Sequence, residues 1–369
     1  MKRINFYLLL IGLLCSYTGL GQELKLAVAG TSHGHISFIL NKPDKGGFKL
    51  VGVYEPNVTL ANQRAERYKL SKDLLYHDLN KMLDEVKPDA VVAFGSIYDH
   101  LEVVEACAPR GIHVMVEKPL ATNMKHAQRM MDLAQKHNIH LLTDYETSWY
   151  PTSVKSYQLV HDSLFVGNLR KVVIHDGHKG PKEIGCGPEF LEWLTDPVLN
   201  GGGAVVDFGC YGANLMTWLT KGEKPISVSA VLRQFKPDVY PKVDDDATII
   251  VSYPNSQCVI QASWNWPINR KDMEIYGDKG YVFAMDSNTL KTRKESMRAE
   301  HVRRITSGET SANQAPVYED PFSYFADVIN GKIKMEPYGL YSPENNLMVV
   351  KILDAARKSA KTGKAVVFK

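Results

Sequence analysis

The chain before residue 143 contains five short apolar runs that lack the polar alternation of a half-exposed strand. Strands that are buried on both faces of a parallel sheet have this pattern, because helices cover both faces. Between the runs, apolar residues recur at helical spacing, so strand and helix alternate along the sequence. This pattern predicts an α/β fold with a doubly wound parallel sheet at its N-terminal end. The runs occupy residues 24–29, 49–54, 90–94, 114–116 and 139–142.

Polar residues follow four of these runs at the point where each strand should end. Right-handed crossovers bring the carboxyl ends of parallel strands to one edge of the sheet. Ligands of open α/β sheets bind in the crevice at that edge. We therefore expect Gly30, Glu55, Ser96 and Lys118 to face one crevice.

The first run and the turn after it have the order of a dinucleotide-binding unit, with a strand, a glycine and the start of a helix. Gly30 occupies the first position of the glycine fingerprint, Ser32 the second and His35 the third. Glu55 closes the second run, about where a ribose diol is held, and its charge favours NAD over NADP. The alternative is an ordinary turn acid before a proline. The predicted cofactor-binding residues are Gly30, Ser32, His33, His35, Glu55, Ser96, His100 and Glu117.

The fourth run ends in Glu117, Lys118 and Pro119. Pro119 has no N–H to donate and biases Lys118 toward an extended conformation, so the strand should stop here. Our hypothesis is that Lys118 points into the crevice and holds a substrate hydroxyl, with Glu117 setting its charge and orientation. The alternative is a strand-end lysine that reaches solvent and pairs with its neighbour.

A glycine run at residues 201–203 precedes a second group of polar residues at helical spacing. Asp207 and Tyr211 are four residues apart and Asn214 is three further on, so one helix would project all three from the same face. A phenol beside an ammonium is a workable general acid/base for a carbinol. The alternative is a glycine-rich helix start with a polar stripe facing solvent.

Two further segments offer substrate contacts. Residues 143–151 are polar and aromatic, and Glu146 and Trp149 suit a sugar, whose C–H faces stack while its hydroxyls hydrogen-bond. An interdomain hinge with packing aromatics explains this segment equally well. A strand near residue 174 ends in two histidines and an acid, of which we expect His178 to line the substrate cleft. Without a third partner at ligand spacing, no metal site is predicted.

The rest of the second half predicts a mostly antiparallel sheet with one open face, which suits either a substrate wall or a subunit interface. We expect a homo-oligomer. Residues 291–316 are polar and lack periodicity, which predicts a flexible loop. The predicted division is a dinucleotide-binding domain at 22–142, an α+β substrate and oligomerisation domain at 143–342, and a closing helix and tail at 343–369. The predicted strands are 226–234, 247–253, 259–266, 273–276 and 280–284, and the closing helices are 320–329 and 343–362.

The N-terminus has the pattern of a cleavable secretory signal at residues 1–21, with two basic residues, a short apolar run and a small-residue site. The run is shorter than the roughly 20 residues of a membrane span. We expect export, to a bacterial periplasm. Loss of these two basic residues changes the net charge from +3 to about +1, which gives no electrostatic basis for binding nucleic acid or membrane. The four remaining cysteines have no disulfide or zinc spacing.

Three features together resemble the Gfo/Idh/MocA oxidoreductase family, which includes glucose–fructose oxidoreductase and inositol dehydrogenases. They are Glu117-Lys118-Pro119, the glycines 201–203 with Asp207 and Tyr211, and the ending at 359–364. The resemblance covers nearly the whole mature chain and implies a Rossmann domain followed by an α+β domain. In this family the lysine and the acid serve the substrate carbinol. A tyrosine at the position of Tyr211 resembles the glucose–fructose oxidoreductase and dihydrodiol dehydrogenase branches.

The resemblance implies hydride transfer between a sugar or glycoside carbinol and a tightly bound nicotinamide. Tyr211 would accept the proton, Lys118 would stabilise the alkoxide, and Asp207 would orient the sugar or tune Lys118. Export would require the cofactor to be recycled by a second substrate, and a 3-keto sugar is our preferred product. Two alternatives remain open, an NAD-dependent redox-neutral glycosidase and a non-catalytic sugar-binding protein. The family pattern is altered at Ser32, His35 and residues 95–97.

Overall fold

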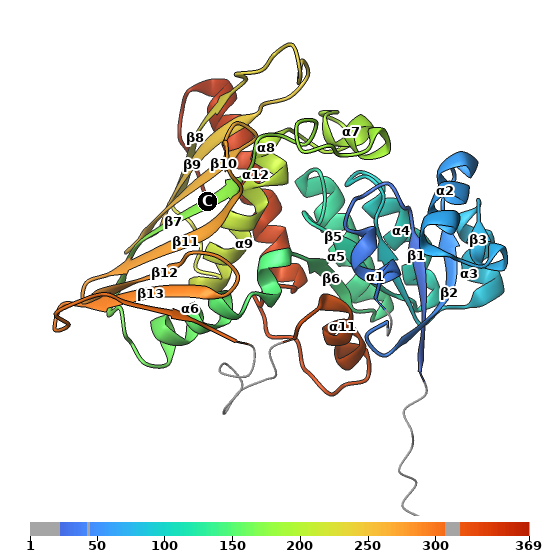
Figure 1. The fold of residues 1–369 in the computed structure, drawn as a ribbon, viewed down its shortest axis with the longest axis horizontal. Helices are drawn as coiled ribbons and strands as arrows, with labels where there is room; N and C mark the ends of the chain where they lie inside the picture. Colours follow the sequence, from blue (N-terminus) through green and yellow to red (C-terminus); the bar gives the residue numbers. More distant parts are fainter. Residues whose placement is uncertain (1–22, 43–44, 307–317, 369) are drawn as a thin grey trace, which may run out of the picture.

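A computed structural model describes residues 23–42, 45–306 and 318–368, and the expected signal at 1–21 lies outside this part of the chain. Two sheets form its two halves, with helices between them (Figure 1). Within the described ranges, no helix combines the length and the apolar character needed to cross a bilayer.

The N-terminal sheet has six parallel strands in the order β3-β2-β1-β4-β5-β6, which confirms the predicted doubly wound domain. The strand order reverses between β1 and β4, and this switch point opens the crevice expected at the carboxyl edge. Its strands are β1 (Leu24–Ala29), β2 (Phe48–Tyr54), β3 (Leu75–Tyr76), β4 (Ala90–Ala93), β5 (His113–Glu117) and β6 (Leu141–Asp144). Its helices are α1 (Ile36–Leu40), α2 (Val58–Tyr68), α3 (Leu79–Val86), α4 (His100–Cys107) and α5 (Met124–His137), with 3-10 turns η1 (Lys72–Leu74) and η2 (Ala108–Arg110).

Side-chain caps fix where three of these helices begin. Asn57, Asp78 and Asn123 each accept a hydrogen bond from the backbone N–H three residues later, at the starts of α2, α3 and α5. Each cap satisfies a donor that the helix itself cannot pair. Because the caps follow the strand ends closely, each helix turns back at once over the sheet.

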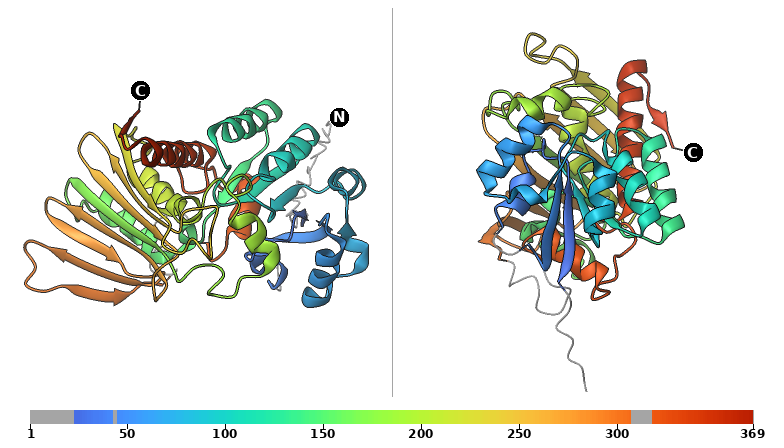
Figure 2. Two further views of the ribbon diagram at one scale, coloured as in Figure 1. Left: turned by 90° about the horizontal axis from the view of Figure 1, so that it is seen from above. Right: turned by 90° about the vertical axis from the view of Figure 1, so that its right-hand side faces the viewer.

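The C-terminal sheet has nine strands in the order β14-β13-β12-β11-β7-β10-β9-β8-β15, and β7 and β10 form its one parallel pair within the described residues. Helices cover the face toward the N-terminal domain, and no described helix covers the outer face (Figures 1 and 2). This confirms the predicted open sheet. Its strands are β7 (Leu169–Gly177), β8 (Ser227–Arg233), β9 (Asp246–Ser252), β10 (Gln257–Ser263), β11 (Arg270–Gly277), β12 (Gly280–Ala284), β13 (Thr289–Lys294), β14 (His301–Arg304) and β15 (Val366–Val367). The covering helices are α6 (Pro151–His161), α8 (Ala204–Asp207), α9 (Gly209–Leu219) and α12 (Pro343–Thr362).

The predicted loop at 291–316 is wrong in its first part. Strands β13 and β14 form an antiparallel pair there, at the edge of the sheet. Strands at the edge of a sheet often carry charged side chains, which discourage pairing with another chain. Because these two strands are rich in Lys and Arg, the sequence shows no apolar alternation that would have predicted them. Residues 307–316 of the predicted loop lie outside the described residues.

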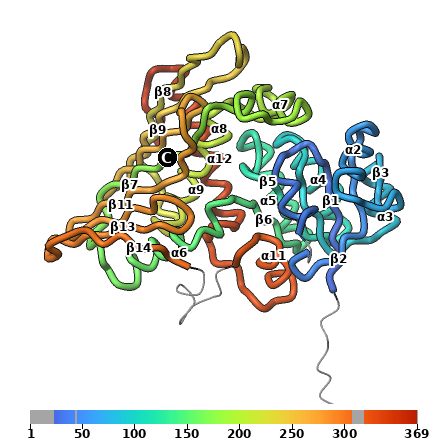
Figure 3. Tube along the Cα trace, in the orientation of Figure 1, coloured from blue at the N-terminus to red at the C-terminus, as the bar shows by residue number. Residues whose placement is uncertain are grey.

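The two halves are joined by more than a hinge. Helix α11 (Pro321–Ile329), which falls within the predicted domain 143–342, packs against the N-terminal half, where the rings of Phe48 and Phe325 are 5.8 Å apart. In α12, the Arg357 guanidinium donates to the carbonyl of Thr122 at 2.8 Å. A helix that the sequence did not predict, α7 (Pro188–Leu194), reaches across to the N-terminal domain (Figure 3).

Candidate active site

Lys118 and Asp207 form a buried ion pair between the two halves. The Lys118 Nζ lies 2.5 Å from Asp207 Oδ1, and both side chains are less than one-tenth exposed. Burial alone would lower the pKa of Lys118 and raise that of Asp207, but their pairing reverses both directions. The other oxygen of Asp207 accepts the indole N–H of Trp264 at 3.0 Å. Lys118 is therefore held as an ammonium with a fixed orientation.

The predicted single helix through Asp207, Tyr211 and Asn214 is wrong, because α8 ends at Asp207 and α9 begins at Gly209. The break frees the Asp207 carbonyl from a regular helical bond. That oxygen accepts Lys118 Nζ at 3.1 Å and the Cys210 thiol at 3.3 Å. The interrupted helix thus gives Lys118 a second acceptor.

The glycine run 201–203 explains how α8 is positioned. A Cβ on Gly203 would lie 1.8 Å from the carbonyl oxygen of Asp244, so only glycine fits there. The Asp244 carboxylate accepts the N–H groups of Gly203 and Val205 at 2.9 and 2.7 Å. The close approach therefore serves a capping aspartate from a distant loop.

Tyr211 lies on α9 beside this pair. It lines the main cavity of the protein, a space of about 1100 Å³ whose walls come from both halves. Its ring centroid is 5.3 Å from Lys118 Nζ and 4.4 Å from Lys271 Nζ. Burial, with Glu146 and Asp176 next, raises the pKa of Tyr211 well above its ordinary value. The phenol is thus protonated at neutral pH, although ammonium groups stand close to its ring.

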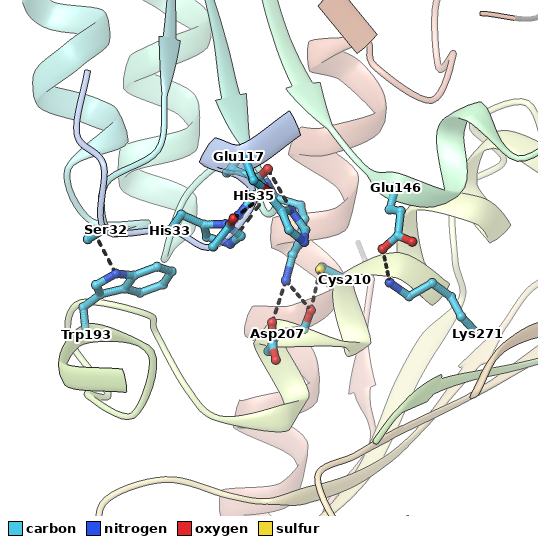
Figure 4. Close-up of polar contacts among 12 residues, drawn as sticks. Ser32, His33, His35, Glu117, Glu146, Trp193, Asp207, Cys210 and Lys271 are labelled. Atoms are coloured by element: carbon cyan, nitrogen blue, oxygen red, sulfur yellow. Dashed lines mark hydrogen bonds and ion pairs between the residues drawn. The ribbon is translucent and has the colours of Figure 1, made fainter. Parts of the chain in front are cut away.

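Behind Lys118, Glu117 bonds to the turn that follows β1, residues 30–35, which we call the dinucleotide loop. His35 Nδ1 lies 3.0 Å from one carboxylate oxygen of Glu117, and His33 Nε2 lies 3.8 Å from the other (Figure 4). Burial lowers the pKa of His33 to about 3, so this imidazole is neutral. Burial would raise the pKa of Glu117, but His35, His33 and Lys118 lower it to about 2. Glu117 does not line the main cavity, and we assign it to positioning the two histidines that do.

The three groups His33, His35 and Glu117 have the proximity of metal ligands. However, His33 Nδ1 accepts the backbone N–H of His35 at 3.1 Å. The neutral ring then carries its proton on Nε2, the nitrogen that faces Glu117, and Nε2 cannot also bind a metal. The geometry therefore favours a hydrogen-bonded cluster.

A smaller cavity of about 210 Å³ lies over the carboxyl ends of β1, β2 and β4, and shares Ser32 with the main one. A Cβ on Gly30 would meet the Gly95 nitrogen at 2.6 Å, so the loop needs glycine to pack this closely. His100 Nδ1 lies 3.2 Å from the Leu120 carbonyl, while its buried Nε2 has no partner in the described structure. Gly30, Glu55 and His100 all line this cavity.

Glu55 holds the loop as well as lining the cavity. Its Oε2 accepts both the backbone N–H and the hydroxyl of Thr31, at 2.8 and 2.7 Å. Ser96, by contrast, does not line the cavity. Its hydroxyl donates to Asp99 at 2.7 Å in the turn before α4, and the side chain that reaches the cavity there is Asp99.

Helix α7 lies over the dinucleotide loop. The indole N–H of Trp193 donates to the Ser32 hydroxyl at 3.0 Å (Figure 4). Arg64 donates to the Thr31 carbonyl at 3.1 Å and to Glu189 at 2.7 Å. These bonds fasten the C-terminal half directly onto the cofactor side of the crevice.

The main cavity has a volume of about 1100 Å³ and contains the other predicted substrate residues Glu146 and His178. The ammonium of Lys271 lies 2.7 Å from Glu146 (Figure 4). His178 Nδ1 accepts the Gly180 N–H at 2.9 Å, and burial lowers the pKa of His178.

The predictions for Trp149 and Asn214 are wrong in their placement, since neither lines the cavity. The Trp149 ring packs edge-on against Phe38, with centroids 5.5 Å apart. The Asn214 amide donates to the Leu340 carbonyl at 2.8 Å and to Asn345 at 3.2 Å, which joins α9 to the start of α12.

Two charged residues of the cavity, Asp176 and Lys271, were absent from the predicted site. Lys271 lies on the same face of β11 as the buried Met273 and Ile275, and this alternation was the signal that could have found it. Asp176 lies likewise two residues beyond the buried Ile174 on β7.

Sequence comparison gives two matches to models of one family, which together cover about two thirds of the chain. Residues 24–145 match the model described as an oxidoreductase family with an NAD-binding Rossmann fold. Residues 158–283 match the model described as the GFO/IDH/MocA C-terminal domain.

Among curated relatives, trans-1,2-dihydrobenzene-1,2-diol dehydrogenase of Xenopus laevis is 28% identical over 52% of this chain and 54% of its own length. The match thus spans about half of that relative. The enzyme of the same name from Sus scrofa is 24% identical over 70% of this chain and 72% of its own. D-xylose 1-dehydrogenase [NADP(+)] of Haloarcula marismortui is 23% identical over 72% of this chain and 71% of its own.

Two solved structures share the fold. Aldose-aldose oxidoreductase from Caulobacter crescentus, complexed with glycerol, gives a TM-score of 0.75 at 21% identity, covering 94% of this chain and 100% of that one. An inositol dehydrogenase homologue from Azotobacter vinelandii, complexed with NAD+, gives 0.77 at 15% identity, covering 94% and 98%.

Proposed function

Because the chain belongs to the Gfo/Idh/MocA family of oxidoreductases, we propose that it oxidises a CH–OH group of a sugar or glycoside with a bound nicotinamide cofactor. The observation that carries this proposal is the buried Lys118–Asp207 pair beside Tyr211, in a cavity that adjoins the dinucleotide loop at Ser32. A sugar-binding protein without chemistry would gain nothing from a buried ion pair at this point.

The smaller cavity fits the adenosine side of a dinucleotide. Gly30 permits the close approach of backbone to ligand, and the unpartnered Nε2 of His100 offers a hydrogen bond. The Glu55 carboxylate would accept from a ribose diol and repel a 2′-phosphate, so we propose NAD as the cofactor. When bound, the nicotinamide accepts a hydride at its C4 atom.

The residues of the chain would supply binding, charge and proton transfer. Lys118 stays cationic and stabilises the negative charge that develops on the carbinol oxygen. Asp207 holds the ammonium in place from two directions. In the reductive direction, neutral Tyr211 donates its proton to the carbonyl oxygen. Oxidation reverses this step from the phenolate form, which the ammonium groups of Lys118 and Lys271 stabilise.

Helix α7 supports a second element of the proposal, a cofactor that stays bound between turnovers. The bonds Trp193–Ser32 and Arg64–Glu189 close the C-terminal half over the dinucleotide loop. A retained cofactor must be reoxidised in place, and a second sugar can do this. Such exchange would suit an exported protein, and we propose export on the basis of residues 1–21.

The identity of the oxidised product is also a proposal. The cavity of about 1100 Å³ has room for a glycoside in addition to a nicotinamide ring, and we propose oxidation at C3 to a 3-keto sugar. NMR of the reaction mixture separates this outcome from redox-neutral glycoside cleavage, because only oxidation leaves a new ketone signal.

The outer face of the C-terminal sheet supports the proposal of a homo-oligomer. Val231 and Ile250 are exposed there and carry large apolar side chains on neighbouring strands. Val173 and Val259, paired across β7 and β10, continue the same face. Sedimentation of the purified protein, compared with a Val231→Lys variant, tests whether this face associates.

The test of the central proposal is the Tyr211→Phe variant. Loss of the hydroxyl should lower turnover by about 10²–10⁴-fold and leave NAD binding unchanged. Tyr281→Phe is the control, because Tyr281 lies on β12 outside the cavity lining and its hydroxyl bonds to the exposed Glu300. Full turnover in Tyr211→Phe would overturn the assigned acid/base role.

A further inference from the structure

Asp176 is a buried carboxylate on the wall of the main cavity. It lies near the end of β7, and its side chain points to the inner face with Val172 and Ile174. The residue is 1% exposed, and neither carboxylate oxygen has a hydrogen-bond partner within the described chain. A buried carboxyl group whose two oxygens have no hydrogen-bond partner destabilises the fold, because neither its neutral nor its ionised form recovers the hydrogen bonds that it makes with water. Its partner should therefore be a ligand.

Lys271 lies directly opposite Asp176 on β11. Residues opposite each other on antiparallel strands are close enough for side-chain pairing. The Lys271 ammonium nevertheless bonds to Glu146, at 2.7 Å, and leaves both oxygens of Asp176 open. Burial raises the pKa of Asp176 to about 8, with Lys271 and Lys118 opposing the rise and Glu146 and Asp207 adding to it.

Tyr211 stands between two charged positions. Lys118, proposed to hold the oxidised carbinol, is 5.3 Å from the ring centroid, and Lys271 is 4.4 Å from it. Asp176 is paired with Lys271 across β7 and β11, so it lies on the same side of the Tyr211 ring as Lys271. A substrate whose oxidised carbon lies at Tyr211 would therefore present its neighbouring substituents to Asp176.

We propose that Asp176 is a specificity-determining residue that accepts a hydrogen bond from the hydroxyl next to the oxidised carbinol. The inference rests on the proposed function and goes beyond it by assigning a protein partner to the hydroxyl beside the reacting carbon of a sugar. A mono-alcohol is rejected because it leaves the buried carboxylate without a donor. Sites built to bind a hydroxyl discriminate strongly against analogues that lack it.

The test compares trans-1,2-cyclohexanediol with cyclohexanol, two probes that differ by one hydroxyl. The variants are Asp176→Asn and Asp176→Leu, with Asp278→Asn as the control. Asp278 lies in the turn between β11 and β12, outside the lining of the main cavity, and its carboxylate already accepts from Asn168. The expected wild-type preference in kcat/KM for the diol is at least about a hundredfold. Asp176→Leu should reduce that preference at least tenfold, and Asp278→Asn should leave it unchanged.

Thermal denaturation gives a second readout that does not depend on turnover. Without ligand, Asp176→Leu should melt at or above the wild-type temperature, because a buried carboxyl group without partners has been removed, whereas Asp176→Asn keeps an unpaired polar group and should melt near the wild-type temperature. The diol should raise the wild-type melting temperature more than that of Asp176→Leu. Equal stabilisation of both proteins by the diol, or a wild-type enzyme that oxidises cyclohexanol as well as the diol, overturns the inference. Oxidation of no alcohol by an NAD-loaded wild type would instead defeat the proposed function, and the thermal shifts would still decide the role of Asp176.

Discussion

The buried pair of Lys118 and Asp207 gives a quantitative prediction for stability. The Asp207→Asn variant removes the charge and leaves the Lys118 ammonium with the Asp207 backbone carbonyl as its remaining acceptor. Removing one partner of a buried ion pair costs about 3–5 kcal/mol, because the other charge stays buried without compensation. We expect the melting temperature to fall by on the order of 5–10 °C.

The pH dependence of this loss provides an internal check. In the wild type, pairing keeps the pKa of Lys118 raised, so its contribution to stability is complete below the ordinary pKa of an unfolded lysine and is lost as the pH rises from there through the raised value. In Asp207→Asn, burial dominates and lowers the pKa of Lys118 below its unfolded value. The folded variant then releases its proton before the unfolded chain does, and its stability rises with pH in that interval. The stability deficit of the variant against wild type should narrow as the pH rises toward the ordinary pKa of lysine, about 10.4.

A double-mutant cycle with Lys118→Met completes the test. The double variant Lys118→Met/Asp207→Asn carries no unpaired buried charge and should be more stable than Asp207→Asn alone, although inactive. Thermal melts of the four proteins, followed by circular dichroism, measure the coupling. The argument from burial would be refuted if Asp207→Asn lost less than about 1 kcal/mol of unfolding free energy. It would also be refuted if the losses in the two single variants added up to the loss in the double variant.

Three further predictions concern the cofactor and the proton. The rate of carbinol oxidation in wild type should increase with pH throughout the alkaline range, because burial and nearby carboxylates raise the pKa of Tyr211; a maximum near pH 6 in the rate profile would contradict this. Arg64→Met should speed release of bound nucleotide several-fold in a dilution assay, since it unfastens α7 from the dinucleotide loop, and an unchanged release rate would mean that α7 does not retain the cofactor. Glu55→Gln should raise the affinity for NADP relative to NAD at least about tenfold, because the repelling charge is gone, whereas an unchanged ratio in titrations would remove Glu55 from cofactor selection.

The N-terminal half could be predicted from sequence because its signals are local. Apolar runs without alternation, each followed by helical spacing, predicted five of the six parallel strands, all but the two-residue edge strand β3, and placed Gly30, Glu55 and Lys118 at one edge. The family resemblance implied that Asp207 orients the sugar or tunes Lys118, and the two side chains form an ion pair. The prediction failed at Ser96, whose hydroxyl is taken by Asp99 within its own turn.

The failures in the second half have long-range causes. The helix break after Asp207 is accompanied by contacts from distant residues, since Asp244 caps the start of α8 and Lys118 bonds to the Asp207 carbonyl, and no local pattern marks it. Asn214 then joins α12 instead of the cavity. Lys271 was missed because the predicted strand began at residue 273, whereas β11 begins at Arg270 and its alternation places Lys271 on the same face as Met273.

Identification of the nucleotide in the purified protein tests directly whether the chain holds NAD and uses it to oxidise a sugar. The protein is denatured, any released nucleotide is identified by mass, and the experiment is repeated after incubation with sugars. The account predicts close to one NAD per chain, with its NADH fraction changed by a sugar in the wild type and not in Tyr211→Phe. A protein that carries no nucleotide and takes up none from added NAD would contradict the account.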